Sequence, residues 1–456
     1  MSLSVRCRVK RCLLLGALWV YAWPSQAALT LDEAVAIARD NDPWLLGSEY
    51  RESALKAQST AAGTLPDPVV NVGFVNVPTD SWDFDQENMT QFKVGVMQQF
   101  PRGDTRALSR QRLALLGSQY PHQRDERRAK VTANITQLWL EAYRAQESIR
   151  LIELDRELFE HLVDVAQSSY SSALGRTRQQ DLVRAQLELT RLEDRLAVLQ
   201  ERRAVARARL GEWLLLAPAA ESSMDPVWNE GERYDQELAP TLPQLELLQP
   251  QLYSGSDEVP APVLARHLQR HPAILSIERR IDASRTDIEL AEQKYRPQFS
   301  VNAAYGYRED DPMGNDRADF FSVGVAFDLP LFTSKRQDQQ VQSAIADSEA
   351  LRTEKWLALR NMMAAFATQR SRLQRLEQRR ELYRSRLLQE MQEQAEASLT
   401  AYTRDDGDFS EVVRARIDEL NARVEALDIE VDRLQVISQL NYFFAGQLAG
   451  AGGGES

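Results

Sequence analysis

The stretch that decides the fold reads FSVNAAYGY at residues 299–307. Apolar side chains occupy every second position from Phe299 to Tyr307, and the positions between them hold mostly polar or small residues. A period of two predicts a β-strand with one apolar face and one polar face. The length of the stretch also suits a tilted strand that crosses a lipid bilayer, which needs about 9–11 residues.

Three further segments alternate in the same way, so the sequence predicts four strands, at about 69–77, 90–99, 298–307 and 319–328. One such strand alone would favour a soluble hairpin, but four of them with flanking aromatic residues favour a membrane-spanning sheet. The face predicted to contact lipid includes Val72, Phe74, Val94, Val301, Val323 and Val325. The face predicted to line a lumen includes Asn71, Lys93, Asn302 and Asp328.

Four strands cannot close a barrel, and an open sheet edge in hydrocarbon leaves backbone groups without hydrogen-bond partners. A membrane sheet of this size therefore requires several copies of the chain. Two copies would give about eight strands, with an interior filled by side chains, whereas three would give about twelve and leave a lumen.

The sequence contains the same unit twice. Asp42-Pro43 recurs as His271-Pro272, and Phe100-Pro101 recurs as Leu329-Pro330. A unit of about 230 residues is far longer than the 20–50-residue periods of solenoids and propellers, which excludes those folds. The predicted parts are a first repeat at 28–230, a linker at 231–260, a second repeat at 261–447 and a Gly-rich tail at 448–456.

Each repeat is predicted to open with a helix that ends at a proline, followed by two strands and then by two long helices. The long helices form antiparallel hairpins at about 103–213 and about 333–445, with turns near 171–178 and 403–409. No proline interrupts residues 122–217, and apolar residues recur there in a narrow heptad seam, as in a coiled coil. The seam after the first turn consists of Leu182, Ala185, Leu189, Leu192, Leu196 and Leu199. The fold class is therefore mixed and mostly α.

Residues 1–27 are predicted to be a secretory signal peptide. Basic residues precede an apolar run at 12–23, and Ser25-Gln26-Ala27 places small residues where a signal peptidase cleaves. Cleavage would remove the chain's two cysteines, Cys7 and Cys12, so we expect no disulfide in the mature chain. Neither cysteine stands in the sequence context of a lipoprotein signal, so we expect no lipid anchor.

Composition and motifs exclude several other classes of protein. The net charge of −12 argues against nucleic acid as a partner, because phosphate binding needs clustered, unopposed Lys and Arg. A mean hydropathy of −0.44, with no apolar run of about 20 residues past the N-terminus, argues against a helical membrane protein. His267 and His271 are spaced like zinc ligands, but Leu268 stands where a metalloprotease has its catalytic Glu, so we interpret both as helix surface. We expect no enzyme activity, metal site or cofactor.

A duplicated unit of helix, β-hairpin and long helical hairpin behind a signal peptide resembles the outer membrane factors, the TolC family. The strand exits at Phe100-Pro101 and Leu329-Pro330 and the Tyr-x4-Gly turns at 170–175 and 402–407 carry this resemblance. It implies a homotrimer with a twelve-stranded β-barrel in the outer membrane and an α-helical barrel that extends into the periplasm. It also implies outer-membrane lipid, a periplasmic adaptor and an inner-membrane transporter as partners.

The resemblance also implies functional residues at the hairpin turns. The tips that would dock the adaptor comprise Ala173, Leu174, Gly175, Arg176, Thr177, Arg404, Asp405, Gly407 and Phe409. In the family, acidic side chains just beyond the turns converge on the tunnel axis, and Asp181 and Glu411 hold the matching positions. Arg184 and Arg414 stand three residues further on, so each acid could pair with an arginine in a periplasmic gate, or all four could be ordinary surface charges.

The implied function is the outer-membrane exit duct of a tripartite efflux system. Residues 65–68, 76–78 and 99–101 resemble the heavy-metal efflux branch (CusC and CzcC types), although Gly103-Asp104 replaces that branch's usual Gly-Lys. Heavy-metal cations are therefore one expected cargo, and drugs, other small molecules or type I secretion substrates remain alternatives. A periplasmic coiled-coil scaffold would explain the helices but not the four strands.

Overall fold

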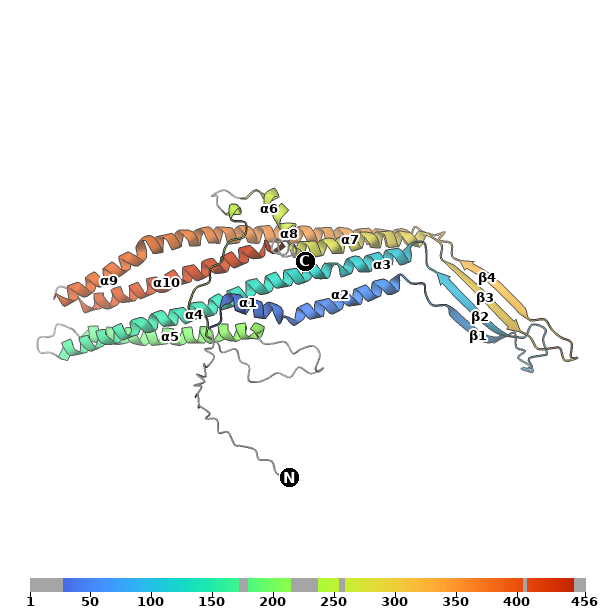
Figure 1. The fold of residues 1–456 in the computed structure, drawn as a ribbon, viewed down its shortest axis with the longest axis horizontal. Coiled ribbons are helices and arrows are strands. Elements are labelled where there is room, and N and C mark those ends of the chain that lie inside the picture. Colours follow the sequence, from blue (N-terminus) through green and yellow to red (C-terminus); the bar gives the residue numbers. More distant parts are fainter. Residues whose placement is uncertain (1–27, 172–178, 215–236, 254–258, 405–407, 447–456) are drawn as a thin grey trace, which may run out of the picture.

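The computed structural model describes residues 28–171, 179–214, 237–253, 259–404 and 408–446. The chain is elongated, with a four-stranded sheet at one end and the ends of the paired helices of two hairpins at the other (Figure 1). The residues of the predicted signal peptide and Gly-rich tail lie outside the described ranges, as does part of the predicted linker.

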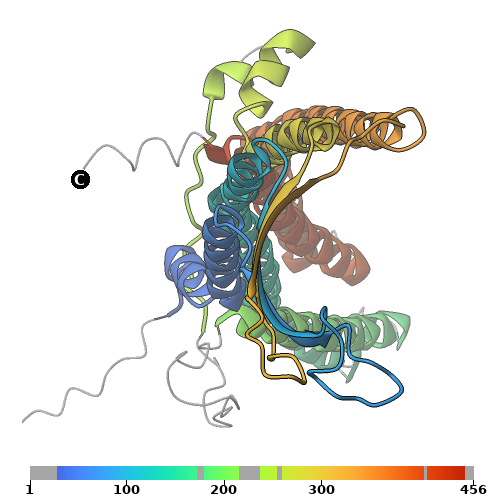
Figure 2. The same cartoon turned by 90° about the vertical axis from the view of Figure 1, so that its right-hand side faces the viewer.

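The sheet consists of β1 (Val69–Val75), β2 (Gln91–Phe100), β3 (Phe299–Tyr307) and β4 (Phe320–Phe327). The strands are antiparallel in the order β1-β2-β3-β4, so the central pair β2–β3 joins the two halves of the chain. All four strands that the alternation predicts are present. The sheet is curved, and its concave side faces the same way as the hollow between the helical hairpins (Figure 2).

The register places the apolar residues of the four strands on one face. Val72 lies opposite Val94, and Val301 lies opposite Val325, whereas Asn302 lies opposite Gly324 on the other face. Directly paired residues point to the same side of a sheet. The lipid-facing and lumen-facing sets predicted from the sequence therefore lie on separate faces.

Long helices form the rest of the molecule. The first hairpin contains α3 (Thr105–Gly117), α4 (Gln119–Ser171) and α5 (Gln179–Leu214), and α4 alone is about 80 Å long at 1.5 Å per residue. The second contains α8 (Gln337–Leu382), a π-helical turn (Tyr383–Leu387), α9 (Leu388–Thr403) and α10 (Phe409–Tyr442). The predicted heptad seam is real, since Ala185, Leu192 and Leu196 are buried in a cluster that also includes Leu420 and Val424 of α10.

The shorter helices correct one prediction. Pro43 and Pro272 do not lead directly to the strands, because each begins another helix, α2 (Pro43–Ala62) or α7 (Pro272–Glu292). These two helices follow α1 (Leu31–Asp40) and α6 (Ala261–Leu268). Proline suits the first position of a helix because that residue's N–H would have no helical partner in any case. Short 3₁₀ turns at Pro250–Leu252 and Gln293–Tyr295 complete the described elements.

The largest core lies where the two repeats meet. Trp139 of α4 is 1 % exposed and donates a hydrogen bond from Nε1 to the carbonyl oxygen of Leu29 at 3.1 Å. Leu29 forms a parallel bridge with Leu238 of the linker, and Phe366 and Phe444 of the second repeat belong to the same core. The described part of the linker is therefore packed against the helices. Among the described helices, none contains a segment that is long and apolar enough to span a membrane.

His271 is a buried helix cap, so its interpretation as helix surface was wrong. It is 1 % exposed, its Nδ1 accepts a hydrogen bond from the backbone N–H of Ala273 at 3.2 Å, and its Nε2 lies 3.1 Å from the carbonyl oxygen of Tyr442. The first bond leaves the ring proton on Nε2, which donates to Tyr442. Burial lowers the pKa of His271, and the Tyr442 carbonyl and the nearby Glu126 carboxylate oppose that shift in part.

The lowered pKa predicts that stability falls at acidic pH. Unfolded His271 takes up a proton as the pH drops below about 6.5, whereas the folded ring resists protonation, so acid favours the unfolded chain down to the folded-state pKa. Thermal unfolding followed by circular dichroism should show a lower midpoint at pH 5.5 than at pH 7.5. We expect His271→Asn to reduce this difference and His161→Asn, at an exposed site on α4, to leave it unchanged. An equal pH dependence in all three proteins would contradict the role of His271.

Candidate functional site

The apolar face of the sheet is exposed to solvent in the single chain. Phe74, Val323 and Val325 are each more than 60 % exposed, and Phe321 is 72 % exposed. Because apolar residues pair across all four strands, they form one continuous surface rather than isolated positions. Large continuous apolar surfaces mark contacts with membranes or with other proteins.

The opposite face is concave and carries the polar and small residues. Asn71, Lys93 and Asn302 line a hollow there, together with Gly73 and other small residues. The glycines make room for these side chains, since a Cβ added to Gly324 would lie only 2.7 Å from Oδ1 of Asn302. The predicted lumen residues Asn71, Lys93 and Asn302 therefore share one open surface.

Asp328, the fourth predicted lumen residue, lies one position beyond β4, at the junction of the sheet with the helices. Its carboxylate forms an ion pair with Arg102 and accepts a hydrogen bond from the backbone N–H of Gln298 at 2.7 Å. The bond from Gln298, with a smaller contribution from Arg102, lowers the pKa of Asp328. Asp328 thus connects the ends of β2, β3 and β4, which alternation alone did not indicate.

Ion pairs join the two helical hairpins midway along their length. Arg144 of α4 lies 3.6 Å from Asp428 of α10 and also pairs with Asp432. Arg423 of α10 lies 3.3 Å from Asp155 of α4. The pKa of Asp428 is raised by burial, and Arg144 opposes that shift. The sequence analysis missed these pairs, because no local pattern links α4 to α10.

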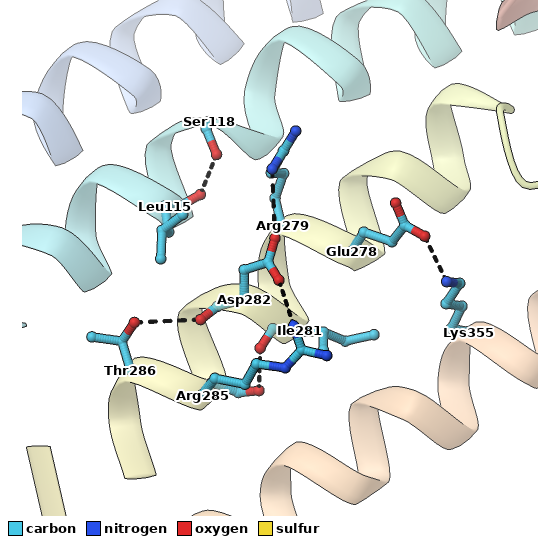
Figure 3. A network of polar contacts seen from close by, with 10 residues as sticks. Leu115, Ser118, Glu278, Arg279, Ile281, Asp282, Arg285, Thr286 and Lys355 are labelled. Carbon is cyan, nitrogen blue, oxygen red and sulfur yellow. Dashed lines mark hydrogen bonds and ion pairs between the residues drawn. The ribbon is translucent and has the colours of Figure 1, made fainter. Parts of the chain in front are cut away.

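A second polar network lies nearer the sheet and surrounds α7 (Figure 3). Lys355 of α8 forms a 2.5 Å ion pair with Glu278 of α7. On α7 itself, Asp282 accepts a hydrogen bond from Arg285 at 3.1 Å. These contacts are mostly exposed, so each stabilises the helix packing by about 1 kcal/mol or less.

The paired helices of both hairpins reach the end of the molecule opposite the sheet (Figure 1). In the first hairpin, α4 ends there at Ser171 and α5 begins at Gln179. In the second, α9 ends at Thr403. Arg404, a predicted docking residue, is exposed. The other predicted docking residues, apart from Phe409, lie outside the described residues: Ala173, Leu174, Gly175, Arg176, Thr177, Asp405 and Gly407.

The sequence predicts Phe409 as part of the docking surface, but its side chain is buried in the structure. It is 3 % exposed, and its ring packs edge-on against Tyr402 with 5.5 Å between ring centroids. The preceding residue, Asp408, caps α10 by accepting a hydrogen bond from the backbone N–H of Ser410 at 3.0 Å. The side chain of Phe409 therefore stabilises the turn in the single chain, and direct docking would require it to leave this packing.

The predicted gate residues occupy matching places in the two hairpins. Asp181 lies in the first turn of α5 and Glu411 in the first turn of α10, where the helix dipole favours a negative charge. Asp181 is buried, whereas Arg184, Glu411 and Arg414 are exposed. Within the described part of the single chain, these three exposed residues form no ion pair, so a closed ring of charges would need neighbouring copies.

The described residues contain no group of three or more His, Cys, Asp or Glu side chains that could hold a metal ion. Among these residues, no third potential metal ligand lies in a group with His267 and His271. The ring of His267 instead lies edge-on to Phe444, with 6.0 Å between centroids.

Comparisons with known proteins agree with the arrangement of sheet and hairpins. Residues 263–442 match the family model described as outer membrane efflux protein. No curated protein matches the sequence. The fold is similar to that of CusC, with a TM-score of 0.68, 15 % identity, and coverage of 91 % of this chain and 91 % of CusC.

Two further solved structures are equally similar in fold. One is VceC of Vibrio cholerae, with a TM-score of 0.70, 14 % identity, and coverage of 91 % of this chain and 96 % of VceC. The other is the CmeC outer membrane channel of Campylobacter jejuni, with a TM-score of 0.70, 13 % identity, and coverage of 91 % and 85 %. Since CusC is no more similar than the other two, the fold does not single out its branch.

Proposed function

We propose that this chain is an outer membrane efflux protein and forms the exit duct of a tripartite efflux system. Its second repeat matches the model of that family, and its fold is similar to that of CusC and VceC. The observation that carries the proposal is the sheet, which has one exposed apolar face, one polar concave face and two unpaired edges. The chain is a channel protein rather than an enzyme. Its location is the outer membrane, and its helices extend into the periplasm.

The unpaired edges support assembly into a homotrimer. Among the strands that the structure describes, β1 and β4 each have one edge without a partner, and such an edge cannot persist in hydrocarbon. Three copies would join β4 of one chain to β1 of the next and close a barrel of about twelve strands. The apolar face would then contact lipid, and Asn71, Lys93 and Asn302 would line the lumen.

The helical hairpins would continue the barrel as a tunnel whose far end meets a periplasmic adaptor and an inner-membrane transporter. The resemblance of residues 65–68 and 99–101 to the heavy-metal efflux branch supports metal cations as cargo. Drug export is the main alternative, and a strain lacking the protein would distinguish them by gaining sensitivity either to copper and zinc or to antibiotics.

Purified protein in planar lipid bilayers tests both the channel and its gate. In a trimer, the narrow periplasmic mouth would contain six acids, from Asp181 and Glu411, and six bases, from Arg184 and Arg414. One exposed pair stabilises the closed mouth by at most about 1 kcal/mol, but a network of pairs can hold it shut until a partner competes for them. We expect Asp181→Ala combined with Glu411→Ala to raise the single-channel conductance and to leave trimer stability nearly unchanged.

Glu349→Ala provides a matched control, because it removes an exposed 2.5 Å ion pair with Arg352 on α8, away from the tips. Its conductance should equal that of the wild type. If the Asp181 and Glu411 variant also conducts like the wild type, these residues are surface charges and the gate lies elsewhere. If the wild-type protein forms no channels and runs as a monomer without detergent, the proposed function is wrong.

A further inference from the structure

The exit from β4 carries an exposed apolar segment that none of the described residues covers. Leu329, Leu331 and Phe332 are 60 %, 72 % and 90 % exposed. The segment is nonetheless ordered by backbone hydrogen bonds, from the N–H of Leu331 to the carbonyl of Leu329 at 2.9 Å and from the N–H of Arg336 to the carbonyl of Thr333 at 3.1 Å. An ordered apolar turn that faces solvent requires a partner.

The equivalent exit in the first repeat has no such surface. Arg102 and Gly103 stand there in place of Leu331 and Phe332. Arg102 donates a hydrogen bond to the carbonyl oxygen of Arg296 at 2.9 Å and pairs with Asp328, and a Cβ at Gly103 would lie 2.4 Å from Arg296. The first exit therefore packs against the chain itself, and only the second remains open.

Two cations, Lys335 and Arg336, stand three and four residues after Phe332. Lys335 and Arg336 are exposed, and within the described residues neither forms an ion pair. The nearest carboxylates in the sequence have other partners, since Asp328 pairs with Arg102 and Asp338 accepts a hydrogen bond from the hydroxyl of Tyr295 at 2.7 Å. The two side chains thus form a local positive charge on a chain whose net charge is −12. Their charge fits an anionic partner.

The position of the segment identifies that partner as lipid. The odd-numbered residues of β4, including Val323 and Val325, form the apolar face, and Leu329 continues the same alternation. If β4 crosses an apolar layer about 25 Å thick, the residues after it lie among the phospholipid headgroups of the periplasmic leaflet. Large apolar side chains followed by Lys and Arg suit this zone, where acyl chains meet phosphates.

We propose that Leu331 and Phe332 insert into the periplasmic leaflet of the outer membrane and that Lys335 and Arg336 bind the phosphates of anionic phospholipids there. The inference rests on the proposed function, because it requires the sheet to lie in the membrane. It adds a lipid-selective anchor in the second repeat only, with three copies around a trimer.

The depth of Phe332 tests the insertion. We would label Phe332→Cys with a nitroxide in full-length protein that also carries Cys7→Ser and Cys12→Ser, reconstituted in vesicles of phosphatidylcholine and phosphatidylglycerol. The label should collide with oxygen, which concentrates in lipid, more often than with a water-soluble nickel chelate. Ala350→Cys, at an exposed position further along α8, should show the opposite preference.

The charges are tested by native mass spectrometry of trimers in detergent with added phosphatidylglycerol or phosphatidylcholine. Each cation near a membrane surface strengthens binding about fivefold, so Lys335→Gln with Arg336→Gln should weaken phosphatidylglycerol binding about 25-fold. Arg360→Gln removes an exposed arginine elsewhere on α8 and should have no effect. Phosphatidylcholine should bind all three proteins equally weakly.

The outcomes separate this proposal from the channel function. If trimers form and conduct but the Phe332 label prefers the nickel chelate, or if the glutamine variant binds phosphatidylglycerol like the wild type, the lipid anchor is wrong and the channel stands. A label shielded from both reagents would mean that a second copy of the chain covers the segment, which also overturns the anchor. If the wild-type protein does not form trimers, the proposed function itself fails.

Discussion

Val323→Arg should prevent the protein from accumulating as inserted trimers in the outer membrane. Val323 lies in the middle of β4, 64 % exposed on the apolar face and opposite Ala303. An arginine facing lipid near the bilayer midplane costs about 2–4 kcal/mol, and each trimer would contain this cost three times. Separation of membrane fractions followed by electrophoresis of unheated samples would show the loss of trimers.

Asn302→Arg is the matched control, because it places the same residue on the opposite face of the adjacent strand. Asn302 is exposed on the concave polar face, opposite Gly324, where an arginine can remain in water. We expect near-normal amounts of trimer, with an altered ion selectivity in planar bilayers. If Asn302→Arg abolished assembly and Val323→Arg did not, the assignment of the two faces would be reversed.

Substitution at the hairpin tips should abolish export without affecting assembly. The helices α4, α5, α9 and α10 reach the end of the molecule opposite the sheet (Figure 1), and the tip residues connect them in the sequence. We therefore expect the tips to meet a periplasmic partner end-on. We expect Leu174→Asp combined with Arg176→Glu to make cells as sensitive to exported compounds as a deletion strain. Arg404→Glu, at an exposed position on the neighbouring tip, should have a smaller effect in the same direction.

The control for the tip variants is Arg360→Glu, which reverses an exposed charge on α8 far from the tips. It should leave export and trimer content unchanged. Trimer content of the tip variants should also match the wild type, because these residues lie beyond the buried seam of the hairpins. Wild-type export by the Leu174 and Arg176 variant would show that the adaptor binds elsewhere.

Local periodicity was sufficient to predict most of the architecture. Alternation from Phe299 to Tyr307 predicted both a strand and its two faces, because the side-chain direction in a strand depends only on whether a position is odd or even. The heptad seam containing Leu192 and Leu196 likewise predicted a buried helix contact. The opening helices do end before the prolines, as predicted, at Asp40 and Leu268. The second helices that begin at Pro43 and Pro272 were not predicted, because proline suits both the stop of one helix and the first position of the next.

The candidate site was only partly predictable, for a related reason. The shared face of the predicted lumen residues Asn71, Lys93 and Asn302 follows from alternation, but the contacts of Asp328 depend on Arg102, which lies far away in the sequence. Phe409 was predicted from its position beside a turn, and only the packing against Tyr402 shows that its ring is buried. The roles of the gate residues stay predictions, which the conductance of the Asp181 and Glu411 variant tests.

The sequence by itself determined the four strands, the separation of their faces, the long helical hairpins and the positions of their turns. Each of these follows from the spacing of apolar residues, prolines and glycines within one segment, which local sterics and burial translate directly into structure. Only the tertiary structure decided that β2 pairs with β3, that Arg144 joins α4 to α10, and that His271 is buried against Tyr442. These contacts bring together residues from opposite halves of the chain or from the two ends of one repeat. Such pairings depend on how whole elements pack, and a pattern within any single segment carries no information about them.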